Sequence, residues 1–152
     1  MNLSVVATVT AIAAALIATP APAYAEPVPT TDEVVAVLAG LTDPNIPAAN
    51  KTNIVAPGFS PDDAGIIDDH LHRMDAFGGL LPPDFVVTDI QSAPTNLAGA
   101  TVETTGGYKH ATNPRPIVLV NQGGHWLITS DTAMPVLDAI WRAGQRHIGF
   151  VG

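Results

Sequence analysis

Residues 116–129 read PIVLVNQGGHWLIT and form the strongest β-hairpin pattern in the chain. Two apolar runs are separated by adjacent glycines, which adopt positive φ without steric cost. In the first run, Ile117 and Leu119 point to one face of the strand, while Val118 and Val120 point to the other. Both faces are apolar, so the pattern predicts a central strand that is covered on both sides.

The second run of this hairpin places Trp126 and Ile128 on one face. An indole needs a large buried site and a partner for its N–H group, so we expect both in the fold. If the last helix leaves Val118 and Val120 uncovered, a second copy of the chain would have to cover them. A homodimer therefore stays open as an alternative.

Residues 1–25 have the pattern of a secretory signal peptide. An apolar stretch from Val5 to Ala18 is followed by Pro20 and by the small-residue cleavage site Ala23-Tyr24-Ala25. The stretch is shorter than the ~20 residues that cross a bilayer, so we expect no stable membrane span after cleavage. The predicted location is secreted, either extracellular or associated with the cell wall.

The composition narrows the classes of partner and chemistry. The chain has no Cys, which excludes disulfides and thiolate nucleophiles or ligands. Fourteen acidic and six basic residues, all after the expected cleavage site, give a formal charge of -8. An acidic surface disfavours nucleic acid and anionic membranes as partners. The length after cleavage fits one domain.

Capping signals predict the first two helices. Thr30 and Glu33 form a capping box before an apolar run, which predicts a helix from Thr31 to Leu41. Ser60, followed by a proline and two aspartates, predicts a second helix that Gly78-Gly79 closes.

The segments around these helices are less regular. Residues 26–30 are expected to be a flexible lead-in, and 48–54 a short turn or half-helix. Ser130 is expected to cap a last helix that Gly144 ends, with 144–152 as a tail.

Two further strands are predicted at 85–91 and 100–105, before the hairpin. Helices followed by four consecutive strands and a terminal helix predict an α+β domain over residues 31–143. The expected architecture is a set of N-terminal helices packed on a curved four-stranded antiparallel sheet, with a C-terminal helix.

Several short motifs follow one another along the chain: Leu41-Thr42-Asp43-Pro44-Asn45-Ile46, Ala49-Asn50-Lys51, Leu81-Pro82 with Phe85, Val87-Thr88-Asp89-Ile90-Gln91, Val120-Asn121-Gln122-Gly123-Gly124 and Ala133-Met134. In this order they resemble the mycobacterial low-molecular-weight secreted antigens. The resemblance implies a secreted culture-filtrate protein, immunogenic for pathogen members, with no established enzymatic role. The element order is also similar to the cystatin-like cone shared with ketosteroid isomerase, a fold that hosts enzymes and binding proteins alike.

A carboxylate and imidazole cluster on the second helix is the first candidate for chemistry. Asp68 and Asp69 lie four and three residues before His72, so they could share a cation with it. Two ligands from one helix do not complete a metal site, and no other segment supplies the rest. We therefore interpret the cluster as a solvated helix face and expect no metal or cofactor.

Asp89 is the leading candidate for a general base. Alternation from Phe85 and Val87 would place its side chain on the same face of the strand, inside a cone-shaped fold. The alternative is an outward residue where the strand bends or ends.

A hydrolase triad would combine His110 and His125 with Ser130 or Ser60. Both serines are better explained as helix caps, so we expect no catalytic residue.

The apolar set of Trp126, Ile117, Leu119 and Phe85 is either core or the lining of a ligand pocket. The preferred hypothesis is core, in a non-enzymatic protein that contacts another protein or the envelope through its surface. The alternative is a carrier of a small apolar ligand in the cone. An isomerase-like enzyme is the third hypothesis, and it needs a titratable group such as Asp89 inside that cone.

Overall fold

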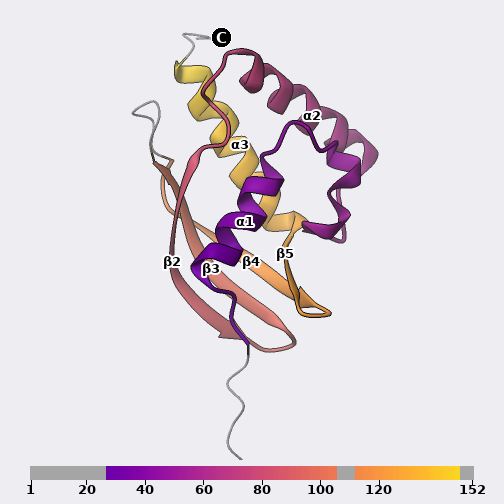
Figure 1. Ribbon diagram of the computed structural model, residues 1–152, viewed down its shortest axis with the longest axis vertical. Coiled ribbons are helices and arrows are strands. Elements are labelled where there is room, and N and C mark those ends of the chain that lie inside the picture. Colours follow the sequence, from indigo (N-terminus) through magenta and orange to yellow (C-terminus); the bar gives the residue numbers. More distant parts are fainter. Residues whose placement is uncertain (1–26, 106–111, 148–152) are drawn as a thin grey trace, which may run out of the picture.

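Five strands form one mixed sheet in the computed structural model, which describes residues 27–105 and 112–147 (Figure 1). They are β1 (Val55–Ala56), β2 (Asp84–Ala93), β3 (Leu97–Thr105), β4 (Arg115–Gln122) and β5 (His125–Thr129). Their spatial order is β1-β5-β4-β3-β2, and the sheet is open, with β1 and β2 at its two edges. Residues 1–25, the predicted signal peptide, lie outside the described residues, as does the end of the tail.

The expected four antiparallel strands are present, but the prediction missed β1. Val55 pairs with Ile128 and Ala56 with Thr129, in parallel, which makes the sheet mixed. The backbone N–H of Ile128 also donates to the carbonyl of Ile54 at 2.9 Å. A strand of two residues is too short to show an alternating pattern, so only the packed fold reveals it.

The hairpin prediction is confirmed, with β4 as the middle strand of the sheet. Gly123 and Gly124 form a two-residue turn with φ of 61° and 88°, the pair of positive values that a type I′ turn requires. The side chain of Asn121 accepts a hydrogen bond from the N–H of Gly124 at 3.0 Å, which fixes the turn.

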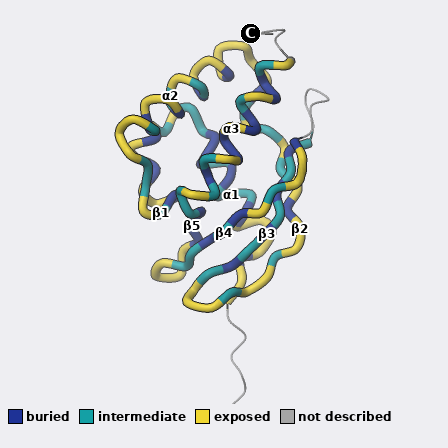
Figure 2. The backbone as a smooth tube through the Cα atoms, turned by 180° about the vertical axis from the view of Figure 1, so that it is seen from behind, coloured by how far each residue is buried: buried dark blue, intermediate teal, exposed yellow. Residues whose placement is uncertain are grey.

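The sheet is less covered on its outer face than the sequence predicted. Ile117 and Leu119 are fully buried, whereas Val118 and Val120 on the opposite face are only half-buried. The same alternation runs along all of β3 (Figure 2). Val118 directly precedes Leu119, where the pairing of β4 with β5 begins. Its N–H donates instead to the Thr132 hydroxyl at 3.1 Å.

Three α-helices and one 3₁₀ helix accompany the sheet in the described residues. They are α1 (Thr31–Leu41), η1 (Ala48–Asn53), α2 (Pro61–Ala76) and α3 (Ser130–His147). The bounds of α1 and its capping box are as predicted, with the N–H of Glu33 donating to Thr30 Oγ1 at 3.2 Å. None of the described helices is long and apolar enough to cross a membrane.

The core lies between the inner face of the sheet and the three α-helices, and all three contribute buried side chains to it. In Figure 1, α1 crosses that face, and it packs against β2 at one side and β5 at the other. Val34, Leu38 and Leu41 of α1 are completely buried, like Leu119 and Ile128 beneath them. Pro29, in the predicted flexible lead-in, is also among the fully buried side chains.

Both predicted ends of α3 need correction. The helix already begins at Ser130, so Thr129 occupies the position before it, and its hydroxyl lies 2.9 Å from that of Thr132. At the other end, the helix continues through Gly144 to His147. A Cβ at Gly144 would lie 3.3 Å from Met74 Cε, so this glycine allows close packing of α3 on α2 rather than ending the helix.

Candidate functional site

A cleft of about 490 Å³ lies between α1, η1 and the β4–β5 hairpin. Its lining residues are Glu33, Ala36, Val37, Thr52, Asn53, Gln122, Gly124, His125, Trp126 and Leu127. We call it the Trp126 cleft. Its volume lies within the ~300–1,000 Å³ that is usual for ligand sites.

Two elements shape this cleft. The I′ turn holds Gln122 and His125 opposite each other at the end of the hairpin, and both are exposed. Ala36 and Val37, from the middle of α1, form the facing wall, with Val37 packed on the core and Ala36 exposed. The cleft therefore joins the hydrophobic core to solvent.

Trp126 is the largest apolar side chain that lines the cleft. It belongs to the core cluster and keeps 8% of its surface exposed. The predicted burial is confirmed, but no described residue makes a hydrogen bond with its indole N–H. The indole thus offers a ligand both an apolar surface and a donor.

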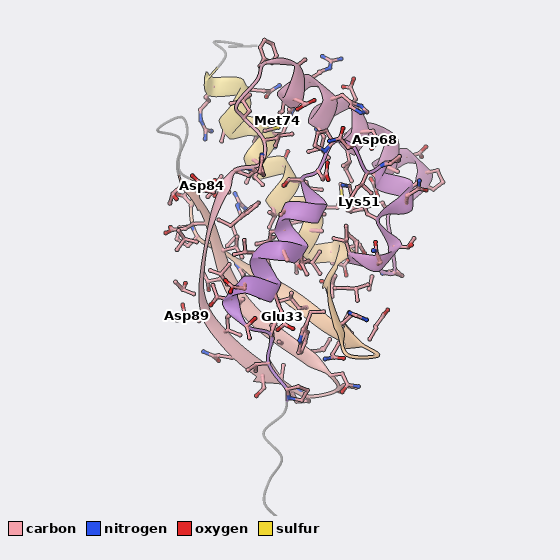
Figure 3. The ribbon with its side chains drawn as sticks, in the orientation of Figure 1. Glu33, Lys51, Asp68, Met74, Asp84 and Asp89 are labelled. Carbon is pink, nitrogen blue, oxygen red and sulfur yellow. The ribbon has the colours of Figure 1, made fainter. Side chains whose placement is uncertain are left out.

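Polar groups surround this apolar floor. The Glu33 carboxylate accepts the N–H of Thr30 at 2.7 Å, which fixes it at the first turn of α1, as labelled in Figure 3. Thr52, Asn53 and His125 contribute exposed hydroxyl, amide and imidazole groups. An apolar centre with a polar rim is the usual arrangement of a binding surface.

Of the apolar set that could have lined a pocket, only Trp126 lines the cleft, and the other three residues belong to the core. Ile117 and Leu119 are at most 1% exposed, and Phe85 is half-buried against the same cluster. Leu38 of α1, completely buried, occupies the same core. Helix α1 therefore fills the concave side of the sheet, and the cleft opens at its edge.

Asp68, Asp69 and His72 do not converge on a metal. Asp68 Oδ1 accepts the N–H of Ala48 at 2.8 Å, and Asp69 pairs with Arg73 at 2.9 Å. His72 is exposed. In residues 27–105 and 112–147, no group of three or more His, Cys, Asp or Glu side chains could hold a metal ion.

Asp68 is half-buried and instead belongs to a polar cluster around the buried Lys51, which the sequence did not reveal (Figure 3). Lys51 is 1% exposed, and its Nζ donates to the carbonyls of Gly40 and Asp43 at 2.7 and 2.8 Å. Burial lowers the pKa of Lys51, while the carboxylates of Asp43 and Asp68 oppose that shift. The cluster ties η1 to the end of α1, so its role is structural.

Asp89 faces away from the core, contrary to the alternation argument. It is exposed, with φ of 52°, and the register between β2 and β3 shifts between Thr88 and Gln91. Such a bulge inserts an extra residue, which ends the alternation from Val87. The competing prediction, an outward residue where the strand bends, is confirmed on this edge strand.

The nominal hydrolase residues are not brought together as a described site. Ser60 caps α2 as predicted, accepting the N–H of Asp63 at 3.2 Å and donating to its carboxylate at 2.8 Å. Ser130 is the first residue of α3, and His125 lines the Trp126 cleft at the other end of β5. His110 lies outside the described residues.

A smaller groove of about 80 Å³ lies between α2 and α3. His70 lines it and stacks on Trp141, with ring centroids 4.0 Å apart and planes 5° from parallel. Burial is the main cause that lowers the pKa of His70. Asp69 and Asp138 raise that pKa, and Arg73 lowers it further. The groove is small, and its aromatic pair joins the two helices.

Comparison with known proteins gives a consistent set of relatives. Residues 27–143 match the family described as Low molecular weight antigen MTB12, C-terminal domain. Low molecular weight antigen MTB12 of Mycobacterium tuberculosis (strain CDC 1551 / Oshkosh) is 38% identical over 118 residues, which cover 78% of this chain and 69% of that protein.

Two further relatives are more distant. The MTB12 homolog of Mycobacterium leprae (strain TN) is 31% identical over 121 residues, covering 80% of this chain and 71% of the relative. The candidate lipoprotein LppK of the same M. tuberculosis strain is 27% identical over 114 residues, covering 73% and 59%. The stretch that matches the family contains every residue that lines the Trp126 cleft.

Proposed function

Because the chain belongs to the family of the low molecular weight antigen MTB12, C-terminal domain, we propose that it is an exported, non-enzymatic protein that binds a partner protein through the Trp126 cleft. Relatives named as antigens and as a candidate lipoprotein support export. The signal-peptide pattern of residues 1–25 supports secretion by cleavage.

The observation that carries this proposal is the open cleft with Trp126 at its floor. Tryptophan is among the residue types that contribute most to binding when they lie at the centre of an interface. Here the indole is held rigidly by the core, so little conformational entropy is lost when a partner covers it. Polar groups on both rims can align a polypeptide without a buried unpaired charge.

Two substitutions that replace an alanine with arginine test the proposal. Ala36→Arg places a long side chain in the cleft, and Ala76→Arg makes the same change at an exposed position on α2 outside it. The protein is isolated without detergent from the medium of its host. We expect a stoichiometric partner with the wild-type and Ala76→Arg proteins and its loss with Ala36→Arg. Equal recovery with both variants, or no partner with any, would contradict the proposal.

A carrier of a small apolar ligand is the second candidate. It is favoured by the volume of the same cleft and by the apolar side chains of Ala36, Val37, Trp126 and Leu127. Native mass spectrometry of the secreted protein would show a stoichiometric adduct in that case. An apolar fluorescent dye that does not bind saturably would count against a carrier.

We further propose that the described fold is a cystatin-like cone of the type shared with ketosteroid isomerase. The element order and the packing of α1 across the inner face of the sheet support this assignment. In this arrangement α1 takes the place of a ligand in the cone. The position of Asp89 on the outer edge argues against an isomerase-like use of the fold.

A further inference from the structure

Three of the six basic residues in this acidic chain line one cleft of about 170 Å³. They are Arg115 at the start of β4 and Arg142 and Arg146 on α3. Thr112, Asn113 and Ala139 complete the lining of this cleft, which we call the arginine cleft. Like charges gathered in this way repel one another unless an anion lies between them.

The spacing on α3 aims its two arginines at the same place. Ala139, Arg142 and Arg146 are three and four residues apart, so they lie on one face of the helix. Ala139 is buried and small, and it leaves room beside the β4 end. The cleft is thus built from a helix face and a strand end.

The opposite wall is held rigidly by two threonines. Thr112 Oγ1 accepts the N–H of Thr104 at 2.9 Å, and the N–H of Thr112 donates to the carbonyl of Thr104 at 3.1 Å. Both residues are buried. These buried bonds fix the backbone three residues before Arg115 and so help to position its side chain.

Arg115 carries the strongest indication of a ligand. Its Nε is buried and has no hydrogen-bond partner among the described residues. Buried donors are almost always paired, and an unpaired one calls for a bound ion or water. Arg115 also lines the arginine cleft, and its guanidinium has further donors besides Nε that can bind an oxyanion.

Simpler roles explain the other two arginines only in part. Arg142 Nε pairs with Asp138 at 2.8 Å, but this pair is exposed, and a guanidinium has further donors. Arg146 lies in the last turn of α3, where a cation interacts favourably with the helix dipole. Neither role involves Arg115, whose side chain lines the same cleft.

We propose that the arginine cleft binds a phosphate group. Guanidinium groups match phosphate oxygens in geometry and charge, and three of them around one cleft favour a dianion over a single carboxylate. A volume of about 170 Å³ is that of roughly five or six waters at ~30 Å³ each, which is enough for a phosphate group. The site lies at the opposite end of β4 from the Trp126 cleft and is independent of it.

Phosphate titration monitored by NMR tests this proposal on the mature chain. Inorganic phosphate should shift the Nε–Hε resonance of Arg115 saturably, and acetate at the same ionic strength should not. The matched pair is Arg142→Gln and Arg73→Gln, since both arginines are exposed and pair with an aspartate four residues earlier. We expect about tenfold weaker phosphate binding for Arg142→Gln, the worth of one charge-assisted hydrogen bond, and no change for Arg73→Gln.

The source of the phosphate is distinguished with vesicles. Binding to phosphatidic acid vesicles, whose headgroup is a phosphomonoester, but not to phosphatidylglycerol vesicles, whose phosphate is a diester, with the same loss in Arg142→Gln would assign the cleft to a lipid headgroup. Binding of inorganic phosphate alone would assign it to a soluble ligand. If phosphate and acetate shift Arg115 equally, if neither probe binds, or if Arg142→Gln and Arg73→Gln behave alike, the proposal is wrong.

Discussion

Replacing Lys51 with methionine should destabilise the fold by about 2–4 kcal/mol, because two carbonyl oxygens lose their hydrogen bonds to a charged donor. Nζ of Lys51 binds the carbonyls of Gly40 and Asp43 at 2.7 and 2.8 Å. Each carbonyl keeps a backbone donor, the N–H of Asp43 at 3.3 Å and that of Ile46 at 3.4 Å, so neither is left unpaired. The loss is that of two hydrogen bonds from a charged donor, at about 1.5–3 kcal/mol each. Part of this loss is offset, because the variant no longer bears the cost of burying a charged ammonium, the same cost that lowers the pKa of Lys51.

Urea unfolding followed by circular dichroism measures this change, and the slope of the transition should stay constant. Arg73→Met is the control, because Arg73 is 64% exposed and its pair with Asp69 should contribute at most about 1 kcal/mol. A surface substitution usually changes the free energy of unfolding by no more than about 0.5 kcal/mol. If Lys51→Met changes it by no more than that, the structural role assigned to Lys51 is refuted.

Two further predictions concern the helices. Gly144→Leu should destabilise the protein by about 1–3 kcal/mol, since a side chain there meets Met74, whereas Gly65→Leu on the open face of α2 should stabilise it by about 0.5–1 kcal/mol. Thermal unfolding of the two variants checks this pair, and equal shifts would contradict the packing of α3 on α2. The lowered pKa of His70 means that the unfolded chain binds its proton more tightly, so stability should fall as the pH drops below 6.5. Between about pH 8 and pH 5, His70→Gln should reduce this loss and His72→Gln should not, and identical pH profiles would show that His70 does not cause it.

Local signals account for the parts of the fold that the sequence predicted well. The capping box at Thr30 and the Ser60 cap each satisfy backbone N–H groups within a few residues, so they define helix starts without tertiary information. The same holds for the two glycines of the hairpin, whose positive φ values are a local property.

The mispredicted parts depend on contacts distant in sequence. Glycine is common at helix ends, but Gly144 lies inside α3, where it packs against Met74 of α2. The bulge that turns Asp89 outward comes from the register between β2 and β3. Pattern-based prediction assumes an uninterrupted period, so it misplaced the end of α3. An outward Asp89 was predicted, but the register shift that causes it was not visible in the sequence.

The candidate sites were even less accessible to sequence analysis. Trp126 was predicted to be buried, but its contact with a cleft depends on the position of α1 across the sheet. Arg115 and Arg146 are far apart in the sequence and meet only because α3 lies beside the start of β4. An Arg three residues after a threonine carries no signal of an anion site on its own.

Site-specific photo-crosslinking tests the central claim most directly, that the Trp126 cleft is the contact surface. A photoreactive residue replaces Gln122 at the rim of the cleft or, as control, exposed Gln91 on β2. In the secreting host, we predict one discrete protein adduct from position 122, absent from position 91 and lost when Ala36→Arg is added. Equal crosslinking from both positions, or an adduct that persists with Ala36→Arg, would contradict the account.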